Sequence, residues 1–267
     1  MDRKPESVTA ENWAQLLEEV YRDAWNPGLR RYRSPFVFRG AGTREGNLVS
    51  RLLRLCARPD GARGMERHLL RNFRKYASAE FPGAGSDWIW LTVAQHHGLP
   101  TRLLDWTFSP LVAIHFATED PRLYDCDGSV WCIDHQQSNR LLPDVLRDVA
   151  MREGADFFTA EMLESVAPEL ERFDSLSQDG LVLFLEPPSL NTRIVNQFAL
   201  FSVMSPPDAM LPDWLAKHPE TAREIVIPAA AKREIRDKLD QAGITERMIF
   251  PGADGIARWL TRYYREI

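Results

Sequence analysis

QHHGLPTRLLDW (95–106) and, after Thr107-Phe108, SPLVAIHFAT (109–118) are the stretches that decide the fold. Ser109 before Pro110 is a strong helix start, because Ser caps a helix N-terminus and Pro favours its first position. The apolar residues that follow cover most of the helix circumference, so burial on nearly every side is expected. The sequence therefore predicts a core helix from 110 to about 118.

The run before this helix is polar and bounded by apolar residues. Ser86 or Asp87 can cap a helix over 88–96, and Gly98 then ends that helix. A stiff polar loop is expected over 95–106. Loops of this kind on a rigid scaffold often carry ligand-binding groups.

Arg102 and Asp105 lie in this predicted loop and leave two interpretations open. If they are buried, they must find partners, because an unpaired buried charge costs several kcal/mol. Pairing with each other or with Arg39 is then expected. If they face solvent, they line a rigid binding pocket.

The N-terminal part predicts a helix followed by a short strand. Thr9 is expected to cap a helix whose apolar residues continue at helical spacing to Tyr21. Pro35 to Phe38 has the composition of a short buried strand. Gly40 and Gly42 are expected to stop it, which places Arg39 at a strand end.

Apolar periodicity and turn residues predict the remaining elements. Further helices are expected at 48–57, 65–81, 229–242 and 252–265, with mostly helical sequence between 138 and 179. Further strands are expected at 128–134, 181–185, 198–203 and 224–227. The predicted class is α+β (mixed α/β), a small sheet of about five short strands surrounded by helices in a single large domain.

The composition is that of a folded globular protein. The 267 residues are 44% hydrophobic, enough to bury a large core without disulfides or metals. Three cysteines form neither an even disulfide set nor a pair with metal-ligand spacing, so a reducing cytoplasm and no metal site are expected. An export signal and a run of about 18 apolar residues are lacking, and no membrane span is expected.

The charge of the chain weakens a nucleic-acid role. A net charge of −5 gives no broad positive field of the kind that non-specific nucleic-acid binding needs. Arginines nevertheless cluster at 30–54 and again at 67–75. A local basic groove and a solvated helix face both fit such clusters.

Arg39 is the first candidate for ligand binding. It precedes Gly40-Ala41-Gly42, where the glycines let a ligand or another backbone approach closely. The planar guanidinium can hold a phosphate or carboxylate through two donors, and it can equally hold a buried aspartate. A ligand and a structural ion pair both remain open for Arg39.

Common enzyme motifs are missing. The chain has no GxSxG, HExxH, Walker A or GxGxxG pattern. His96 and His97 are adjacent, so on a helix they point about 100° apart and do not easily share a metal ion. Either can act as acid or base, and we take His97 as the catalytic candidate. His115, on the buried helix, is expected to be a hydrogen-bonded core residue.

Several blocks of the sequence resemble the signature of FRG domains. They are Phe38-Arg39-Gly40, the run 95–107, Ser109 to Ala113, Phe116-Ala117, Arg193-Ile194, Gln197, Phe201, Gly243-Ile244-Thr245 and Phe250-Pro251. The sequence departs from the family pattern at His97, where an aromatic residue is frequent, and at Ala199, where glycine is frequent. The resemblance implies an N-terminal helix over 1–30, an FRG core over 31–255 and a C-terminal helix over 256–267.

A second resemblance, to ADP-ribosyltransferases, bears on mechanism. It implies that Arg39, with Gly40 beside it, grips the phosphates of NAD, and that Thr107 and Ser109 brace the pocket. The superfamily places a glutamate on a late strand to stabilise the ribose as nicotinamide leaves. Glu186 and Gln197 are the candidates for that position.

Two functions are therefore carried forward. In the first, a cytoplasmic FRG-domain protein uses Arg39, Arg102 and Asp105 to bind a phosphate-bearing ligand, with NAD as the candidate cofactor and ADP-ribose donor. In the second, the same block is the core of a non-catalytic interaction module. Such a module would sense protein, phage components or nucleic acid in bacterial defence.

Overall fold

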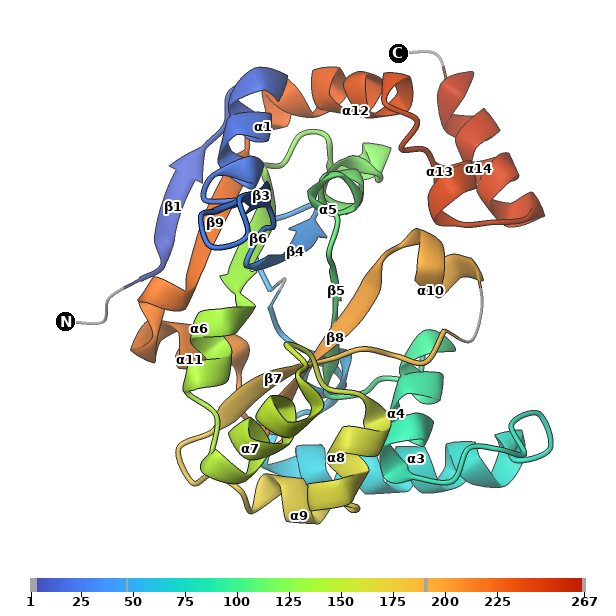
Figure 1. Ribbon diagram of the computed structural model, residues 1–267. Coiled ribbons are helices and arrows are strands. Elements are labelled where there is room, and N and C mark those ends of the chain that lie inside the picture. Colours follow the sequence, from blue (N-terminus) through green and yellow to red (C-terminus); the bar gives the residue numbers. More distant parts are fainter. Residues whose placement is uncertain (1–3, 47, 190–191, 266–267) are drawn as a thin grey trace.

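The computed structural model describes residues 4–46, 48–189 and 192–265. These residues form a mixed α/β fold around a seven-stranded sheet in the order β1-β9-β6-β4-β5-β8-β7 (Figure 1). The strands are β1 (Glu6–Thr9), β4 (Phe36–Ala41), β5 (Leu103–Thr107), β6 (Gly128–Asp134), β7 (Leu181–Leu185), β8 (Ala199–Ser205) and β9 (Ala222–Ile227). A separate hairpin pairs β2 (Trp25–Asn26) with β3 (Arg31–Tyr32).

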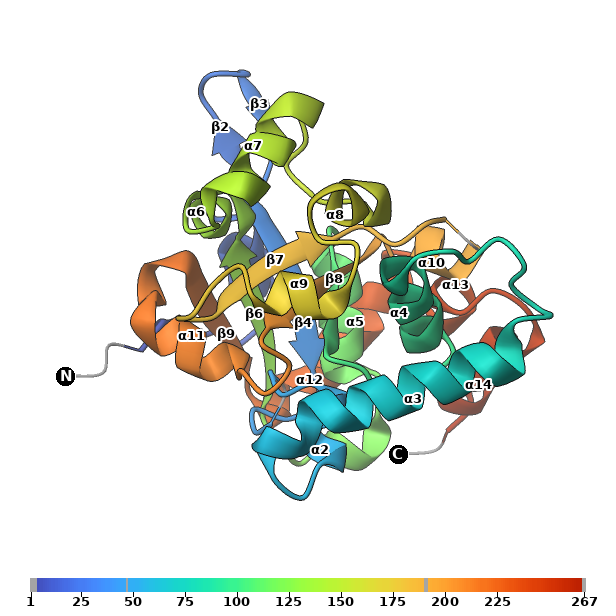
Figure 2. The same cartoon turned by 90° about the horizontal axis from the view of Figure 1, so that it is seen from below.

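Helices surround the sheet in both views (Figures 1 and 2). They are α1 (Trp13–Tyr21), α2 (Arg51–Leu55), α3 (Ala62–Ala77), α4 (Asp87–His96), α5 (Pro110–Thr118), α6 (His135–Arg140), α7 (Asp144–Glu153), α8 (Ala160–Val166), α9 (Leu170–Asp174), α10 (Thr192–Asn196), α11 (Leu211–Lys217), α12 (Lys232–Gln241), α13 (Glu246–Ile249) and α14 (Ala253–Tyr263). Short 3-10 turns lie at Pro59–Gly61, Pro121–Leu123, Pro219–Thr221 and Ala229–Ala231.

The predicted fold class is confirmed, but the sheet is larger than expected. Each of the five predicted strands is present, and β1 and β5 are added to them. The first and last strands of the sheet along the chain are neighbours, because β1 pairs in parallel with β9. The other pairs of neighbouring strands in the sheet are antiparallel.

Two helix and strand boundaries differ from the sequence prediction at the N-terminus. Thr9 does not cap a helix, since it is the last residue of β1 and lies opposite Val226 of β9. Helix α1 starts later, where the side chain of Asn12 accepts a hydrogen bond from the amide of Gln15 at 3.1 Å. The residues around Thr9 therefore pair with a distant strand, β9, instead of starting the helix.

Of the two glycines expected to stop strand β4, Gly40 lies within it and Gly42 follows its last residue. Strand β4 continues to Ala41, with Gly40 opposite Val130 of β6, so Arg39 lies within the strand. A side chain at Gly40 would place its Cβ 1.7 Å from the main-chain oxygen of Ala113 in α5. The glycine is therefore required because α5 rests directly on β4.

The segment 95–106 is not one loop. It contains the end of α4, a turn at Gly98 with φ of +84°, and strand β5, which pairs along its whole length with β8. The stiffness expected of this segment thus comes from sheet pairing. Gly98 ends α4 as predicted, since a positive φ favours glycine.

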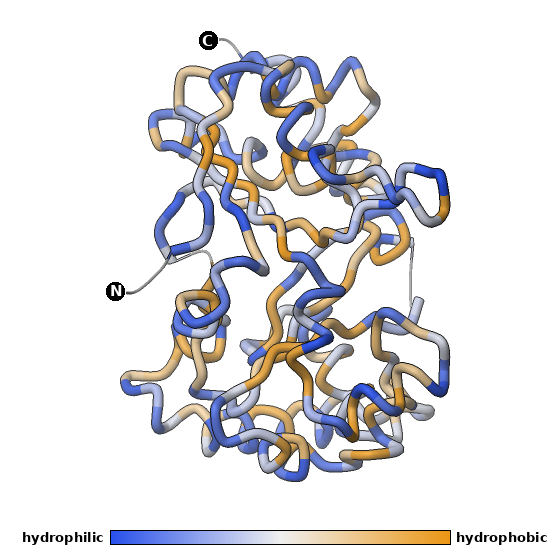
Figure 3. The backbone as a smooth tube through the Cα atoms, turned by 60° about the vertical axis from the view of Figure 1, so that its left-hand side comes forward, coloured by the Kyte–Doolittle hydropathy of each residue, from blue (hydrophilic) through white to orange (hydrophobic). Residues whose placement is uncertain are grey.

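Helix α5 is the predicted core helix, and its start is capped by Ser109 as expected. It packs on β4 and β6 with α1 and α12 beside it, in a cluster that includes Phe38 and Ile225. A second cluster covers β5, β8 and β7 with α3, α4, α8 and α9. Figure 3 shows apolar stretches following the strands through the middle of the molecule.

Candidate functional site

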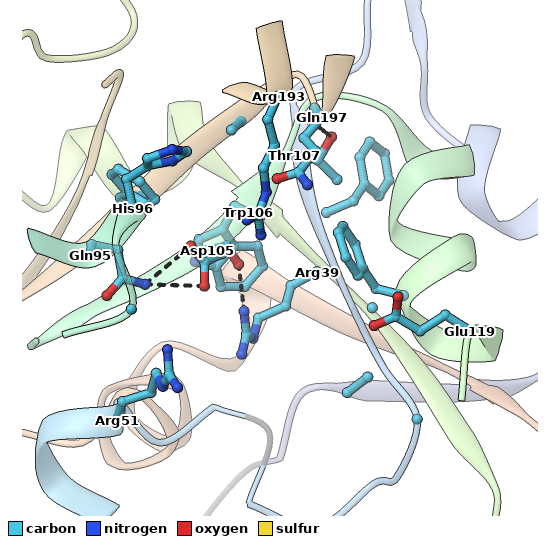
Figure 4. Close-up of a pocket in the computed structure, with 18 of the residues that line it drawn as sticks. Arg39, Arg51, Gln95, His96, Asp105, Trp106, Thr107, Glu119, Arg193 and Gln197 are labelled. Carbon is cyan, nitrogen blue, oxygen red and sulfur yellow. Dashed lines mark hydrogen bonds between the residues drawn. The ribbon is translucent and has the colours of Figure 1, made fainter. Parts of the chain in front are cut away.

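A pocket of about 820 Å³ lies between the C-terminal end of α4 and helix α5. Its walls come from β4, β5, β8 and the ends of α4, α5 and α10, with α2 at the rim (Figure 4). Among the described residues, four arginines and three acidic residues line it: Arg39, Arg51, Arg54, Arg193, Glu45, Asp105 and Glu119. The pocket is thus polar, with a small excess of positive charge.

The floor of the pocket lies where β4 and β5 separate. These two strands are paired at a single position, Phe38 opposite Thr107, whereas each has a full ladder on its other side. Beyond that position, Nη1 of Arg39 donates to the main-chain oxygen of Asp105 at 2.6 Å. The arginine side chain therefore spans the two strands where the ladder ends (Figure 4).

The carboxylate of Asp105 is held by the helix on the other side. Nε2 of Gln95 donates to both carboxylate oxygens at 3.1 Å, and Oε1 of Gln95 accepts from the Thr101 hydroxyl at 2.6 Å. Gln95 is itself buried. The amide therefore fixes the orientation of Asp105 while Arg39 binds its backbone.

The electrostatics of Arg39 favour an anion in the pocket. Burial lowers the pKa of the Arg39 guanidinium, the nearby charge of Asp105 opposes this, and the charge of Arg54 adds to it. A lowered pKa means that the surroundings disfavour the cation. A bound anion would relieve that cost.

His96 and His97 lie at the same end of α4 and line the pocket. Burial lowers the pKa of His96, and the charges of His97 and Arg193 lower it further. The negative charge of Asp105 acts to raise it. His97 is exposed, and its ring packs against His96 and Phe81 at centroid distances of 5.1 and 5.3 Å. The catalytic candidate His97 is therefore at the pocket rim.

Three of the lining arginines were not proposed as site residues from the sequence. Arg51 and Arg54 are three residues apart on α2 and exposed, and Arg193 is the second residue of α10. The available signal was the cluster of arginines after Arg39 and the block Arg193-Ile194. Neither of these two sequence features shows which arginines line the same pocket.

Thr107, Ser109 and Gln197 support the wall of the pocket through one set of contacts. The Thr107 hydroxyl donates to the main-chain oxygen of Gln197 at 2.7 Å and accepts from the Ser109 amide at 3.0 Å. Nε2 of Gln197 donates to the main-chain oxygen of Ile249 at 3.3 Å. Thr107 and Gln197 line the pocket, as does Gly40.

Comparison with protein families then gives one match. Residues 34–126 match the family model of the FRG domain. Comparison with curated proteins and with solved structures gave no match. The FRG match contains Arg39, the α2 arginines, the end of α4, β5 and α5, whereas the pocket wall from Arg193 to Phe201 lies outside it.

Arg102 lies inside the FRG match but not in the pocket. It is 2% exposed, and its guanidinium binds the carboxylates of Glu66 and Asp174, with Nε 2.9 Å from Glu66 and Nη1 2.6 Å from Asp174. Although burial acts to lower it, these two carboxylates raise the pKa of Arg102. Arg102 joins α3 and α9 to the start of β5.

Glu186 also lies away from the pocket. It follows β7 at the sheet edge, where its amide donates to the main-chain oxygen of Phe158 at 2.8 Å, and its side chain is exposed. Partial burial raises the pKa of Glu186. The glutamate expected by analogy is thus not among the residues that line the Arg39 pocket.

Glu119 is a pocket carboxylate that sequence reasoning missed. Its Oε2 lies 3.5 Å from Nε2 of His115, which is fully buried on α5. Nδ1 of His115 contacts Arg236 Nη1 at 2.7 Å, as expected for a hydrogen-bonded core histidine. The spacing of four residues on a helix was the available signal.

The described residues were also compared with what a metal site or a membrane-spanning helix requires. They contain no group of three His, Cys, Asp or Glu side chains placed to hold a metal ion. Within the same ranges, every helix is too short or too polar to cross a bilayer.

Proposed function

We propose that the Arg39 pocket binds a small phosphate-bearing molecule. The observation that carries this is the convergence of Arg39, Arg54 and Arg193, with Arg51, on one pocket whose floor holds a partly desolvated guanidinium. Arginine forks bind phosphate oxygens through paired hydrogen bonds. The pocket volume of about 820 Å³ lies in the range of small-molecule sites.

The ligand class is that of a nucleotide. Trp106, Phe116 and Phe201 add aromatic surface to the pocket, next to its arginines. A nucleotide combines a flat base with phosphates. The base can pack on the aromatic side chains, and the phosphates can bind the arginines. NAD, the cofactor expected from the sequence, belongs to this class.

Transfer of ADP-ribose would require a carboxylate beside the ribose. Breaking the bond between nicotinamide and ribose leaves positive charge on the ribose, which a carboxylate aimed at it stabilises. Glu186 lies outside the pocket, and the Gln197 amide is uncharged and donates to Ile249. Among the carboxylates that line the pocket, we take Asp105 and Glu119 as the candidates for this role.

A binding function without turnover is the alternative. The uncharged amide of Gln197, one of the two candidates for the glutamate position of ADP-ribosyltransferases, favours binding alone. Purified protein incubated with NAD separates the two: release of nicotinamide identifies an enzyme, and intact NAD with measurable affinity identifies a binding module.

The test is calorimetric titration of the protein with NAD, ADP-ribose and pyrophosphate. We expect saturable binding of at least one of them and its loss in Arg39→Ala, with a melting temperature within a few degrees of the parent protein. Arg33→Ala is the matched control, because Arg33 is exposed and donates to the main-chain oxygen of Tyr32 outside the pocket. Collapse of the fold in Arg39→Ala, or equal affinity in both variants, contradicts the proposal.

A further inference from the structure

The positive charge of the protein is concentrated in one segment. Residues 51–75 contain eight arginines and lysines against two acidic residues, a net of +6 in a chain whose net charge is −5. This segment covers α2 and most of α3. The chain as a whole is negatively charged, but this segment is strongly basic.

Four of these cations form a single line on α3, which we call the α3 stripe. Arg63, Arg67, Arg71 and Lys75 follow one another at intervals of four residues, so they share one face of the helix. Each is exposed, and α3 lies on the outside of the molecule (Figure 2). Like charges at this spacing disfavour a helix, so the stripe is not explained by helix stability.

The two halves of the α3 stripe differ in their partners. Arg63 lies 3.8 Å from Asp174, and Arg67 lies 2.9 Å from Glu171, both on α9. Within the described part of the chain, no ion pair joins Arg71 or Lys75 to an acidic side chain. The C-terminal half of the stripe thus presents positive charge to solvent.

A hollow and an aromatic ring lie beside this half. The α3 stripe borders a groove of about 540 Å³ between α3 and α9, which is separate from the Arg39 pocket. Tyr76 is 77% exposed, with the ammonium group of Lys75 5.3 Å from its ring centre. Exposed aromatic rings among cations are the elements on which single-stranded nucleic acids bind, through stacked bases and neutralised phosphates.

We propose that the α3 stripe binds the backbone of single-stranded nucleic acid, with Tyr76 stacking on a base. A line of cations that repeats every turn suits a polymer with a regularly repeated negative charge. Each step along the stripe rises about 6 Å. This site is distinct from the Arg39 pocket, and its function does not rest on the ligand proposed there.

The test is fluorescence anisotropy with labelled oligothymidylate and oligouridylate of about 20 nucleotides, between about 50 and 200 mM salt. We expect Arg71→Glu with Lys75→Glu to lower the affinity at least ten-fold. Loss of two phosphate contacts should also reduce the slope of log affinity against log salt by about 1.4. Tyr76→Ala should weaken binding about five-fold or more.

The control pair is Arg152→Glu with Lys217→Glu, which makes the same charge change on exposed residues of α7 and α11. These helices lie away from α3 in both ribbon views (Figures 1 and 2). The control pair should bind the oligonucleotides several-fold more tightly than the stripe variant. Arg39→Ala should bind them as the parent protein does, so this result is independent of the pocket ligand.

Three results would overturn the proposal. They are absence of oligonucleotide binding at low salt, equal affinity in the stripe and control variants, and capture by phosphatidylserine vesicles without oligonucleotide binding. The last would assign the stripe to an anionic membrane surface.

Discussion

Arg39 binds Asp105 through the backbone: its Nη1 lies 2.6 Å from the main-chain oxygen of Asp105, while Gln95 holds the carboxylate of the same residue. The sequence left open whether Arg39 faces a ligand or pairs with this aspartate. The contact is to a neutral oxygen, so it does not itself neutralise the charge of the guanidinium. Asp105 acts on Arg39 through its nearby charge and opposes the pKa decrease caused by burial.

Replacing Asp105 with Asn should strengthen anion binding. The exposed carboxylate repels an anion in the pocket, and its removal should gain about 1 kcal/mol, or about five-fold in affinity. Titration with pyrophosphate and ADP-ribose measures this. A loss of affinity would instead show that Asp105 accepts a hydrogen bond from the ligand.

Replacing Gly40 with Ala should strongly destabilise the protein. The new methyl group would meet the main-chain oxygen of Ala113 at 1.7 Å, and backbone cannot move aside cheaply. We expect a loss of about 3 kcal/mol or more in urea unfolding. Gly64→Ala is the control, since nothing lies within 4 Å of its Cβ position on α3. It should gain up to about 1 kcal/mol.

Replacing Arg102 with Met should destabilise the protein without affecting the pocket directly. Glu66 would remain buried without its cation, and Asp174 would keep only the more distant Arg63 at 3.8 Å, at a cost of about 3–5 kcal/mol. The triple variant Arg102→Met, Glu66→Gln, Asp174→Asn should recover most of this loss in urea unfolding. If the triple variant is less stable than the single one, the cluster contributes more than charge compensation.

Anion binding in the pocket should be coupled to protonation of His96. In the free protein burial, His97 and Arg193 lower the pKa of His96, and a bound anion adds an opposite charge that raises it. Between the pKa of the free protein and that of the complex, binding takes up a proton, so affinity should rise as pH falls through the pKa of the complex and level off beneath the lowered pKa of the free protein.

Calorimetry with ADP-ribose in two buffers of different ionisation enthalpy measures this proton uptake, because its phosphates do not titrate near neutral pH. His96→Gln should abolish most of it. His68→Gln, an exposed change on α3, is the control. Uptake that persists in His96→Gln assigns the coupling to another group.

Two of the three thiols should react at different rates because they differ in burial. Burial raises the pKa of Cys132 to about 12, and this residue is 0% exposed, whereas Cys126 is exposed. Alkylation of the native protein should therefore modify Cys126 first and spare Cys132 until the protein unfolds. Mass spectrometry over time with iodoacetamide follows both; equal native rates would contradict the buried position of Cys132.

Local signals in the sequence predicted the elements that have strong caps or apolar runs. Ser86 and Ser109 cap α4 and α5 as expected, because each acts on the next turn of its own helix. Strands β1 and β5 were missed, since Val8 is the one apolar residue of β1 and Asp105 interrupts β5. Both form by pairing with strands far along the chain, which periodicity does not reveal.

The site could be predicted only in part, because it too depends on contacts between residues far apart in the sequence. Arg39 and Asp105 were proposed together and do line one pocket, since they lie on neighbouring strands. Arg102 was expected beside them, but its partners Glu66 and Asp174 are 36 and 72 residues away and hold it elsewhere. Sequence proximity to Asp105 could not show this, because the direction of each side chain depends on distant partners.

The three residues Phe38, Arg39 and Gly40 have different roles in the structure. Phe38 belongs to the apolar cluster under α5, and Gly40 is required by the contact with Ala113, so Arg39 is the residue of the three whose side chain can bind an anion. A search that finds Phe-Arg-Gly in another chain therefore detects mainly a helix resting on a strand. The chemistry of such a chain has to be judged from positions outside the motif, such as those equivalent to Arg54 and Arg193.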